Sequence, residues 1–537
     1  MVLEWARKAP SRSGADRRRA FRHELQPMRS EKLHVRGKIP KALEGSLIVA
    51  CSRRIKDRTQ FSRWHDSQTD LIRIDLTPGS PGRAVAEVFT VDPSGSDLGE
   101  SLGQRRRQRV PLESDPRYGY LTQPNHGINV SGETVWVTNL LFGCPLELDL
   151  RKWRPRRVLR YVEPVDDAPR ITGTAHFAWS LDGRYTYFEQ SLLHDAVKGD
   201  TVRSGELRLV RFDTKRKAER IWKLRPPPDD ASLAEANFHS AFYFEEGGRA
   251  YVGLLRTGAV VESLAPHATV TDHAVVPSTA STIWVVPIDE ESDTLAASTL
   301  PGIRELDGIS LSHLDIDNAG GDGFVLYANY KEADVAEETH GVNVYGEQPE
   351  QVVEHYSGMT VEALNVGQVI RVERRRSEVT IKRFKRAYDA GRTSLGHTWL
   401  PINIQLDASR ENLFCSFAGF RPRLLPRHIA SAYPKRAIDP RNIRYVPPLL
   451  MRFDAKSLEP AYSKRPDYLA YGEPIAMCVV GDCESGYVCT FSPELGVRIY
   501  RAGDLSAMEA HVTAHPLWHV NDSHFRPTPP HVVFVPN

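Results

Sequence analysis

The sequence is poor in cysteine and lacks the patterns of a disulfide-rich, zinc-binding or membrane-spanning protein. Its 537 residues include 6 cysteines, and no two of them have the Cys-x-x-Cys spacing of a zinc or dithiol motif. We therefore expect free thiols in a reducing compartment. No run of about 18 apolar residues occurs, and the Arg-rich first thirty residues lack the apolar core of a signal peptide. These absences predict a soluble cytoplasmic protein, with peripheral membrane contact as an open alternative.

A strong net charge is also missing. The 70 basic and 68 acidic side chains give a formal net charge of +2, so no overall field would attract nucleic acid. The basic runs at residues 17–19 and 105–107 are interpreted as solvated loops, with contact to an anionic surface as the alternative. We expect no nucleic-acid partner.

Long amphipathic helical patterns are few, and short runs of Val, Ile, Tyr, Phe and Trp bounded by Gly, Pro, Asp or Asn recur instead. This pattern predicts an all-β protein, either a large propeller or several sandwiches. Residues 1–31 are charged and predict a flexible N-terminal extension. Residues 32–537 are expected to form a single β-propeller domain if the propeller alternative holds. Residues 78–117 predict a long loop, and residues 331–361 an acidic insertion that forms part of a cap. The clearest strands are expected at residues 127–130, 134–138, 207–212, 250–255, 282–287, 324–328, 366–372, 486–491 and 497–500.

Four histidines recur in similar local settings. His176 follows Thr-Ala and precedes an Asp-Gly turn at residues 182–183 and a return strand, which is typical of a β-hairpin. His239 and His313 likewise follow apolar runs and precede Gly-containing turns and further apolar runs. His524 lies close to the C-terminus. Alone, each such histidine is most simply a hydrogen-bonded core residue.

The spacing of these histidines excludes a local metal motif. They are 63 (176 to 239), 74 (239 to 313) and 211 (313 to 524) residues apart, which suits ligands delivered one per blade to a common axis. Imidazole is a good ligand for iron, zinc and copper, and an all-histidine site leaves open positions on the metal. Such an iron could bind O2. His519 and His531 compete with His524 for the last position, and Asp315 and Asp317 are interpreted as solvated side chains.

From about residue 37 to about residue 526, the sequence resembles a known family, the carotenoid cleavage oxygenases. Residues 37–40 (Gly-Lys-Ile-Pro) and 43–47 (Leu-Glu-Gly-Ser-Leu) are similar to the family's opening element. Residues 174–176 with the Asp-Gly turn are similar to its first histidine motif, and His239 and His313 fall in stretches similar to the second and third. Later matches are residues 472–475 (Gly-Glu-Pro-Ile), 481–488 (Gly-Asp-Cys-Glu-Ser-Gly-Tyr-Val) and 501–505 (Arg-Ala-Gly-Asp-Leu).

The resemblance implies a seven-bladed β-propeller with a capping dome of loops and short helices. It implies an Fe(2+) cofactor on the propeller axis, held by His176, His239, His313 and His524, with Glu473 accepting a hydrogen bond from a ligand histidine. The implied activity is that of a non-haem iron dioxygenase: O2-dependent cleavage of a conjugated carbon–carbon double bond to two carbonyl products. The substrate would be an apolar polyene (a carotenoid or apocarotenoid) or a stilbene, and an apolar substrate could draw the enzyme to membranes.

The sequence departs from the family at the expected carboxylates. Leu141 or Phe142 replaces one glutamate, Trp399 replaces another, and His524 lacks the family's Gly-x-His-Gly setting. Loss of such partners weakens metal affinity by roughly ten- to a hundred-fold. An iron-poor, inactive propeller that acts as a binding or scaffold protein therefore remains an alternative. A calcium-dependent hydrolase is a second rival, but it would need carboxylates where this sequence has histidines.

Overall fold

The structure is a computed structural model of the chain. Strands dominate its described residues, among which the helical elements are the short 3₁₀ turns η1 (Lys41–Leu43) and η4 (Pro228–Asp230). No helix in the described part of the chain is long and apolar enough to cross a membrane. The described residues are 28–53, 68–91, 125–131, 134–139, 146–151, 154–158, 170–174, 176–195, 202–216, 218–230, 237–257, 259–263, 273–277, 282–303, 308–318, 320–332, 367–386, 398–421, 444–460, 467–468, 476–492, 496–506, 508–513 and 531–537.

Seven sheets of four to six strands account for most of the described residues, and we number them I to VII. Sheet I contains, in order, β1 (Met28–Leu33), β5 (Arg83–Val91), β4 (Gln68–Thr77), β3 (Gly45–Arg53) and β34 (His531–Pro536). Sheet II contains β6 (Asn125–Ser131), β7 (Thr134–Asn139), β8 (Leu146–Asp149) and β9 (Arg154–Val158). Sheet III contains β10 (Arg170–Gly173), β12 (Tyr185–Asp195), β13 (Val202–Asp213), β14 (Ala218–Arg225) and β20 (Thr294–Ala296), with β11 (Ala178–Trp179) also paired to β12.

The remaining sheets follow the same plan. Sheet IV contains β15 (Asn237–Glu246), β16 (Arg249–Thr257), β19 (Thr282–Pro287) and β21 (Ser298–Thr299). Sheet V contains β22 (Gly308–Asp317), β23 (Phe324–Glu332), β24 (Gly367–Arg375) and β25 (Glu378–Arg386). Sheet VI contains β26 (Thr398–Leu406), β27 (Asn412–Arg421), β28 (Arg444–Asp454) and β29 (Asp467–Tyr468). Sheet VII contains β2 (Val35–Gly37), β33 (Met508–Val512), β32 (Gly496–Arg501), β31 (Tyr487–Ser492) and β30 (Ala476–Val480), and a separate ribbon pairs β17 (Ala259–Ser263) with β18 (His273–Pro277).

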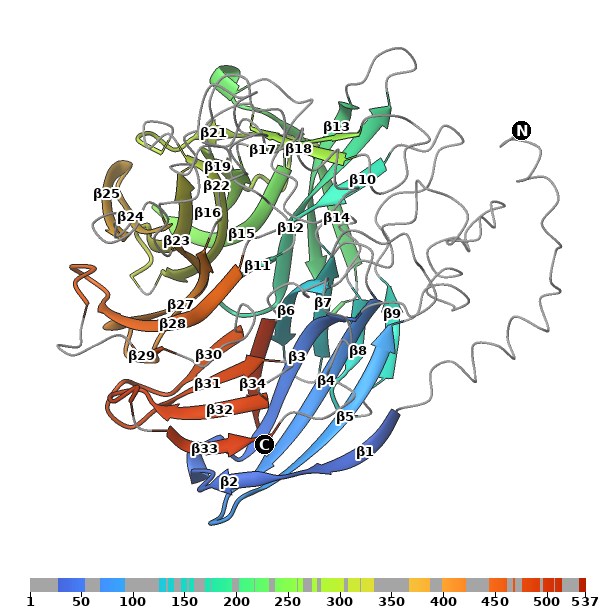
Figure 1. Cartoon of the computed structure of the whole chain (residues 1–537). Helices are drawn as coiled ribbons and strands as arrows, with labels where there is room; N and C mark the ends of the chain where they lie inside the picture. The colour runs from blue at the N-terminus through green and yellow to red at the C-terminus, as the bar shows by residue number, and fades with distance from the viewer. Residues whose placement is uncertain are drawn as a thin grey trace, which may run out of the picture.

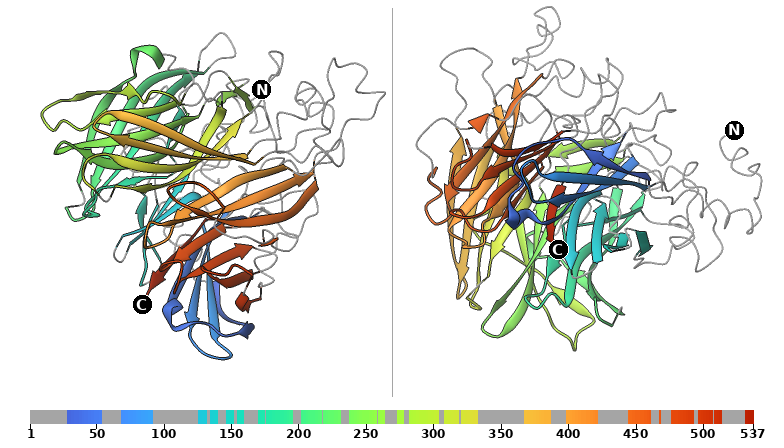
Figure 2. Two further views of the ribbon diagram at one scale, coloured as in Figure 1. Left: turned by 90° about the vertical axis from the view of Figure 1, so that its left-hand side faces the viewer. Right: turned by 90° about the horizontal axis from the view of Figure 1, so that it is seen from below.

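The sheets pack face to face and follow one another round the molecule, which Figures 1 and 2 show as a succession of colours from blue to red. A buried apolar cluster fills the interface between each sheet and the next, in the order I, VII, VI, V, IV, III, II. Sheet II then meets sheet I through contacts of β6 with β34 and β3, which complete the ring. Representative members of the clusters are Val49 and Ile499 (I–VII), Leu450 and Val488 (VII–VI), Tyr327 and Leu413 (VI–V), Leu255 and Leu326 (V–IV), Leu209 and Leu254 (IV–III), and Phe188 and Trp136 (III–II). This closed arrangement of seven sheets is that of a seven-bladed β-propeller.

Strands from the two ends of the described chain join within sheets I and VII. In sheet I β34 pairs with β3, and in sheet VII β2 pairs with β33. Gly37 and Gly45 make these close approaches possible, because a Cβ atom would lie 2.2 Å from the Glu509 carbonyl oxygen at the first and 2.3 Å from the Val535 carbonyl oxygen at the second. The two glycines of the opening sequence element therefore have a structural role in closing the ring.

The prediction of a loop over residues 78–117 was wrong in its first part, and residues 92–117 lie outside the described residues. The expected loop at residues 78–117 contains β5, which lies between β4 and β1 in sheet I. Its polar residues lie on one face, where Glu87 is directly opposite Arg73 and pairs with it at 2.5 Å, while Ala84 and Ala86 are buried on the other. The Val, Phe and Thr residues of β5 favour a strand, and β4 and β1 pair with it on both sides.

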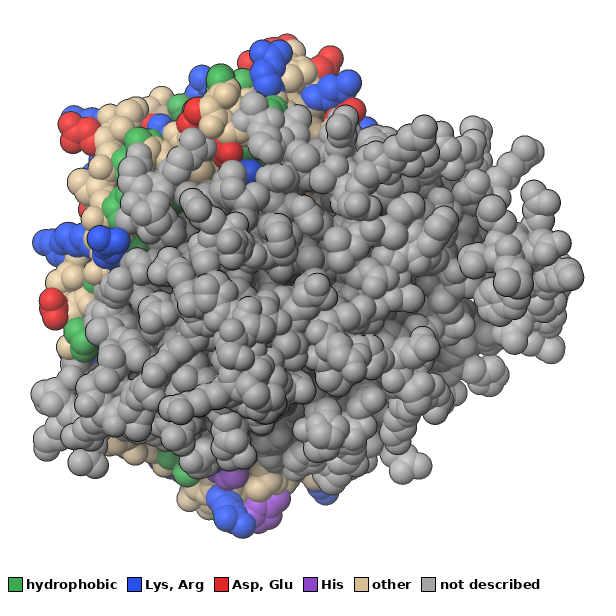
Figure 3. Space-filling model, turned by 45° about the horizontal axis from the view of Figure 1, so that its top comes forward, with side chains coloured by type: hydrophobic (Ala, Val, Ile, Leu, Met, Phe, Trp, Pro, Cys, Tyr) green, Lys and Arg blue, Asp and Glu red, His purple; other side chains and the backbone are tan. Residues whose placement is uncertain are grey.

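The predicted fold class and strands agree with the structure, whereas two predicted segment boundaries differ, since residues 331–332 of the predicted insertion belong to β23. The all-β propeller is confirmed, and each predicted strand coincides with an observed one. Residues 28–31 of the predicted extension belong to β1, and residues 333–361 of the predicted cap lie outside the described residues. On the face shown in Figure 3 the described acidic and basic side chains are interspersed, in keeping with the small net charge.

Candidate metal centre

The innermost strands of the sheets carry the histidines, and local irregularities orient them. On β15, Phe238 is opposite Arg256 and Ser240 is opposite Leu255, so His239 is the extra residue of a β-bulge. On β22, residues 312–313 face residue 329 alone, so His313 also lies at a bulge. A bulge turns a side chain out of the regular alternation of a strand and is common next to functional sites.

His176 lies between β10, whose last residue Gly173 is opposite Gln190 of β12, and β11, whose first residue Ala178 is opposite Tyr187. Its backbone bonds to the neighbouring sheet: the His176 amide donates to the His239 carbonyl at 3.1 Å, and the Ala241 amide donates to the His176 carbonyl at 2.8 Å. These two bonds fix His176 and His239 relative to each other. The predicted turn at residues 182–183 follows, with Gly183 at a φ of 64°.

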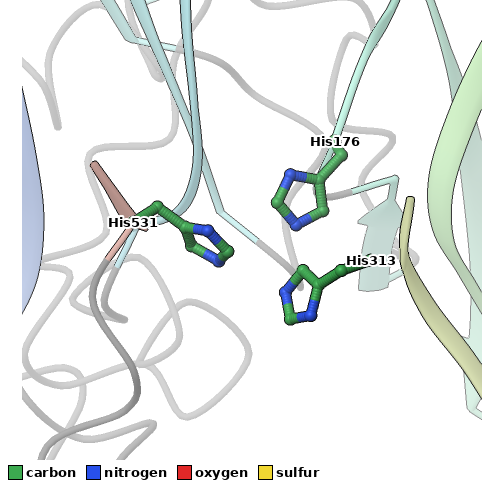
Figure 4. Close-up of side chains that lie close together, drawn as sticks. All are labelled: His176, His313 and His531. Carbon is green, nitrogen blue, oxygen red and sulfur yellow. The ribbon is translucent and has the colours of Figure 1, made fainter. Parts of the chain in front are cut away.

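His531 is the first residue of β34 and faces the same space from the opposite side of the axis. Figure 4 shows its ring pointing toward those of His176 and His313. The ring centroids are 4.8 Å apart for His176 and His531, 4.9 Å for His313 and His531, and 5.0 Å for His176 and His313. One ring nitrogen of each of the three residues lies within 4.8 Å of those of the other two.

His239 adds a fourth ring to this group. Its centroid is 5.2 Å from that of His176 and 5.0 Å from that of His313. Its Nδ1 is 3.2 Å from Ser240 Oγ, a contact that holds the ring in place. His176 and His313 thus each lie beside both His239 and His531. His239 lies beside two of the clustered imidazoles, but it is not one of the three whose ring nitrogens lie within 4.8 Å of one another.

The donor set fits a transition metal. Three nitrogens bound to one ion at about 2.1 Å lie roughly 3.0 to 3.6 Å apart, so the three clustered rings, whose nitrogens lie within 4.8 Å of one another, need to approach by up to about 1 to 2 Å. Burial lowers the pKa of His531 to about 4, so this ring is neutral near pH 7, as a ligand must be. Among the described residues, no cysteine or carboxylate joins the group. An all-imidazole site suits iron, zinc or copper.

The structure brings together three of the four histidines predicted from the sequence. His176, His239 and His313 lie side by side, whereas His524 and Glu473 lie outside the described residues. His531, which the sequence offered only as a competitor of His524, is the C-terminal histidine of the cluster. Its signal was the β-branched run that follows it, Val-Val-Phe-Val, which marks an inner strand.

A cavity of about 720 Å³ extends along the axis from the histidines. His176, His313 and His531 line one part of it, and Ala42 and Gly481, which lie in turns, line another. Apolar side chains such as Phe242 and Val533 alternate there with polar ones.

Asp315 lines this cavity and corrects the expectation of a solvated side chain. Its Oδ2 accepts a hydrogen bond from the Leu406 amide at 2.7 Å, and its Oδ1 accepts one from the Ile316 amide at 2.8 Å. Burial raises the pKa of Asp315 despite these two bonds. Gln405 forms a similar link, since its Oε1 accepts from the Val479 amide at 2.8 Å. The two side chains join β22 to β26 and β26 to β30 around the axis.

Solved structures with the same architecture provide the comparison. No family model and no curated protein sequence matches the chain. The structure is similar to that of a Synechocystis apocarotenoid oxygenase variant, with 12% sequence identity, a TM-score of 0.53, and coverage of 97% of this chain and 99% of that chain. It is similar to cobalt-substituted Synechocystis apocarotenoid oxygenase (13% identity, TM-score 0.51, 97% and 99% covered). It is also similar to Pseudomonas brassicacearum lignostilbene dioxygenase (11% identity, TM-score 0.50, 95% and 96% covered).

Proposed function

Because the chain has the fold of the carotenoid cleavage oxygenases, we propose that it is a non-haem iron dioxygenase. It would cleave a conjugated carbon–carbon double bond in an apolar polyene or a stilbene and give two carbonyl products. The observation that carries the proposal is the convergence of imidazoles on the propeller axis, where they line a cavity. The similar structures include an apocarotenoid oxygenase and a lignostilbene dioxygenase. Apocarotenoids and lignostilbenes both contain conjugated double bonds.

We propose His176, His239, His313 and His531 as the ligands of Fe(2+), with His531 in the place predicted for His524. In this group the rings of His176 and His313 lie beside each other, and each also lies beside the rings of His239 and His531. When bound, iron with only imidazole ligands would keep open positions at which it activates O2.

The protein's own part in the reaction is to hold neutral ligands in fixed positions and to exclude water. Backbone geometry fixes the point from which each imidazole projects, through the bulges at His239 and His313 and the backbone hydrogen bonds of His176. Burial keeps His531 unprotonated. No carboxylate or thiol of the described residues joins the imidazoles. Protein acid–base catalysis is therefore not part of the proposal.

The test is turnover of a panel of apocarotenoids and hydroxylated stilbenes by the protein reconstituted anaerobically with Fe(2+) and then exposed to O2. We expect two carbonyl products from at least one compound, detected by mass spectrometry. Turnover should stop when iron is removed with a chelator and return when Fe(2+) is restored. An anaerobic sample is the control for oxygen dependence. An iron-loaded, folded protein that cleaves no member of the panel would contradict the assignment of the reaction.

A second candidate is an iron-poor propeller that binds an apolar molecule without cleaving it. The sequence favours it at one point, since Leu141 or Phe142 stands where one carboxylate was expected and Trp399 where another was expected. Binding of a polyene by metal-free protein, with no cleavage after iron is added, would identify this function. Either function involves molecules that partition into lipid, so we place the protein in the cytoplasm with peripheral contact to membranes.

A further inference from the structure

Two cysteines face each other on neighbouring strands near the axis. Cys478 of β30 is directly opposite Cys489 of β31 in the antiparallel register. Both belong to the same buried cluster, together with Ile499 of the next strand. Their side chains therefore project from the same face of sheet VII, the face that packs against sheet I.

The spacing of such a pair suits a disulfide. Residues directly opposite on antiparallel strands have Cα atoms about 4.5 or 5.5 Å apart, and both values fall within the roughly 4.4–6.8 Å that a disulfide spans. The two thiols also interact, since a hydrogen bond with Cys478, together with burial, raises the pKa of Cys489 well above its usual value. A sulfur–sulfur bond could form here without rearrangement of the strands.

The two thiols differ in their access to small molecules. Both side chains are almost completely buried, with 3% of Cys478 and 1% of Cys489 exposed. Cys478 lines the axial cavity, whereas Cys489 lies behind it and is absent from the cavity lining. A small oxidant that enters the cavity therefore meets Cys478 first.

We propose that Cys478 and Cys489 form a thiol pair that is oxidised by hydrogen peroxide entering through the axial cavity. The Cys478 sulfur attacks one peroxide oxygen, the O–O bond breaks, and Cys478 becomes a sulfenic acid with release of one water. The Cys489 sulfur then attacks the sulfenic sulfur, and the S–O bond breaks with release of a second water. Together the thiols lose two protons and two electrons and form one disulfide. Thiol exchange in a reducing compartment restores them. This inference does not depend on a bound metal.

Cys415 provides a matched comparison. It is fully buried in sheet VI, burial raises the pKa of its thiol well above the usual value, and its Sγ contacts the Ser416 carbonyl oxygen at 3.7 Å. Cys415 is neither part of the cavity lining nor paired with a cysteine, since Met451 and Ile404 are the residues opposite it. Cys415 is thus as buried as Cys478 and Cys489, and it differs from them in lying away from the cavity and from any other cysteine of the described residues.

The experiment treats the folded, metal-free full chain with hydrogen peroxide, blocks the remaining thiols, and digests the protein without reductant for mass spectrometry. We expect a peptide that joins Cys478 to Cys489, with the loss of two hydrogens, and its disappearance on addition of dithiothreitol. The Cys415→Ala variant should give the same yield. Wild-type protein in which both thiols stay reduced, or in which Cys478 is a stable sulfenic acid and no disulfide forms, would overturn the proposal.

Single variants test the order of the two steps. In Cys489→Ala, Cys478 should stop at the sulfenic acid, which dimedone traps. In Cys478→Ala, Cys489 should remain reduced because the cavity does not reach it. Circular dichroism of both variants verifies the fold. A folded Cys478→Ala protein whose Cys489 is oxidised as fast as Cys478 in the other variant would contradict the proposed route of entry.

Discussion

Replacement of His531 by alanine is expected to lower the affinity for iron by about 100-fold or more, a loss at least as large as that caused by removal of a residue that merely supports a ligand. His531 is the ring that faces His176 and His313 across the axis, at centroid distances of 4.8 and 4.9 Å. Without it, the three remaining imidazoles lie on one side of the axis. Such a site has fewer ligands and admits water to the metal.

The matched control is His524→Ala, which removes the histidine that the sequence motif favoured. This variant should keep the wild-type affinity within about two-fold. Both affinities are measured by anaerobic competition with a chromophoric iron chelator, and thermal melts establish that the variants are folded. A folded His531→Ala protein with wild-type iron affinity, together with a His524→Ala protein that has lost iron, would show that His524 and not His531 is the fourth ligand.

Asp230→Ala is expected to destabilise the fold by about 3 to 5 kcal/mol, the usual cost of removing one partner of a buried ion pair. The Asp230 carboxylate accepts hydrogen bonds from Arg256 Nη1 at 2.7 Å, Thr282 Oγ1 at 2.8 Å and Trp284 Nε1 at 2.7 Å. The Arg256 and Asp230 side chains are 1% and 4% exposed. The variant therefore removes the buried carboxylate that pairs with the Arg256 guanidinium.

The adjacent residue offers the control for this second variant. Asp229 is exposed at the same 3₁₀ turn, where it accepts a hydrogen bond from Thr299. Asp229→Ala should change the free energy of unfolding by less than about 0.5 kcal/mol, as is usual for surface substitutions. Urea unfolding followed by tryptophan fluorescence measures both. Equal midpoints for the two variants would show that the buried ion pair does not stabilise this part of the propeller.

The fold could be predicted from the sequence because the β-signal is repeated along the whole chain. Residues 282–287, for example, combine β-branched and aromatic residues with flanking turns and form β19 in the interior of sheet IV. The segment that became β5 was missed because it was grouped with the polar, Arg-, Gly- and Ser-rich residues around it, although its own Val, Phe and Thr residues favour a strand. Its structure depends on pairing on both sides, with β4, which directly precedes it in the chain, and with β1, about 50 residues earlier.

The candidate site was predictable in part for the same reason. His176, His239 and His313 each precede a turn and a second strand, so their position at a strand end could be read locally. The bulges that orient two of them leave no sequence signal, because they depend on register between strands. His531 was ranked below His524 because only the pairing of β34 with β3, close to 500 residues earlier in the chain, places it on the axis.

The most direct test of the proposed metal centre is the iron content of the wild-type protein after anaerobic reconstitution with Fe(2+) and desalting. Elemental analysis should find about one iron per chain, since the four proposed imidazole ligands form a single site. Circular dichroism of the same sample establishes that the protein is folded. A folded protein that retains no iron would contradict the proposed metal centre, and a propeller that binds apolar molecules would then be the better description.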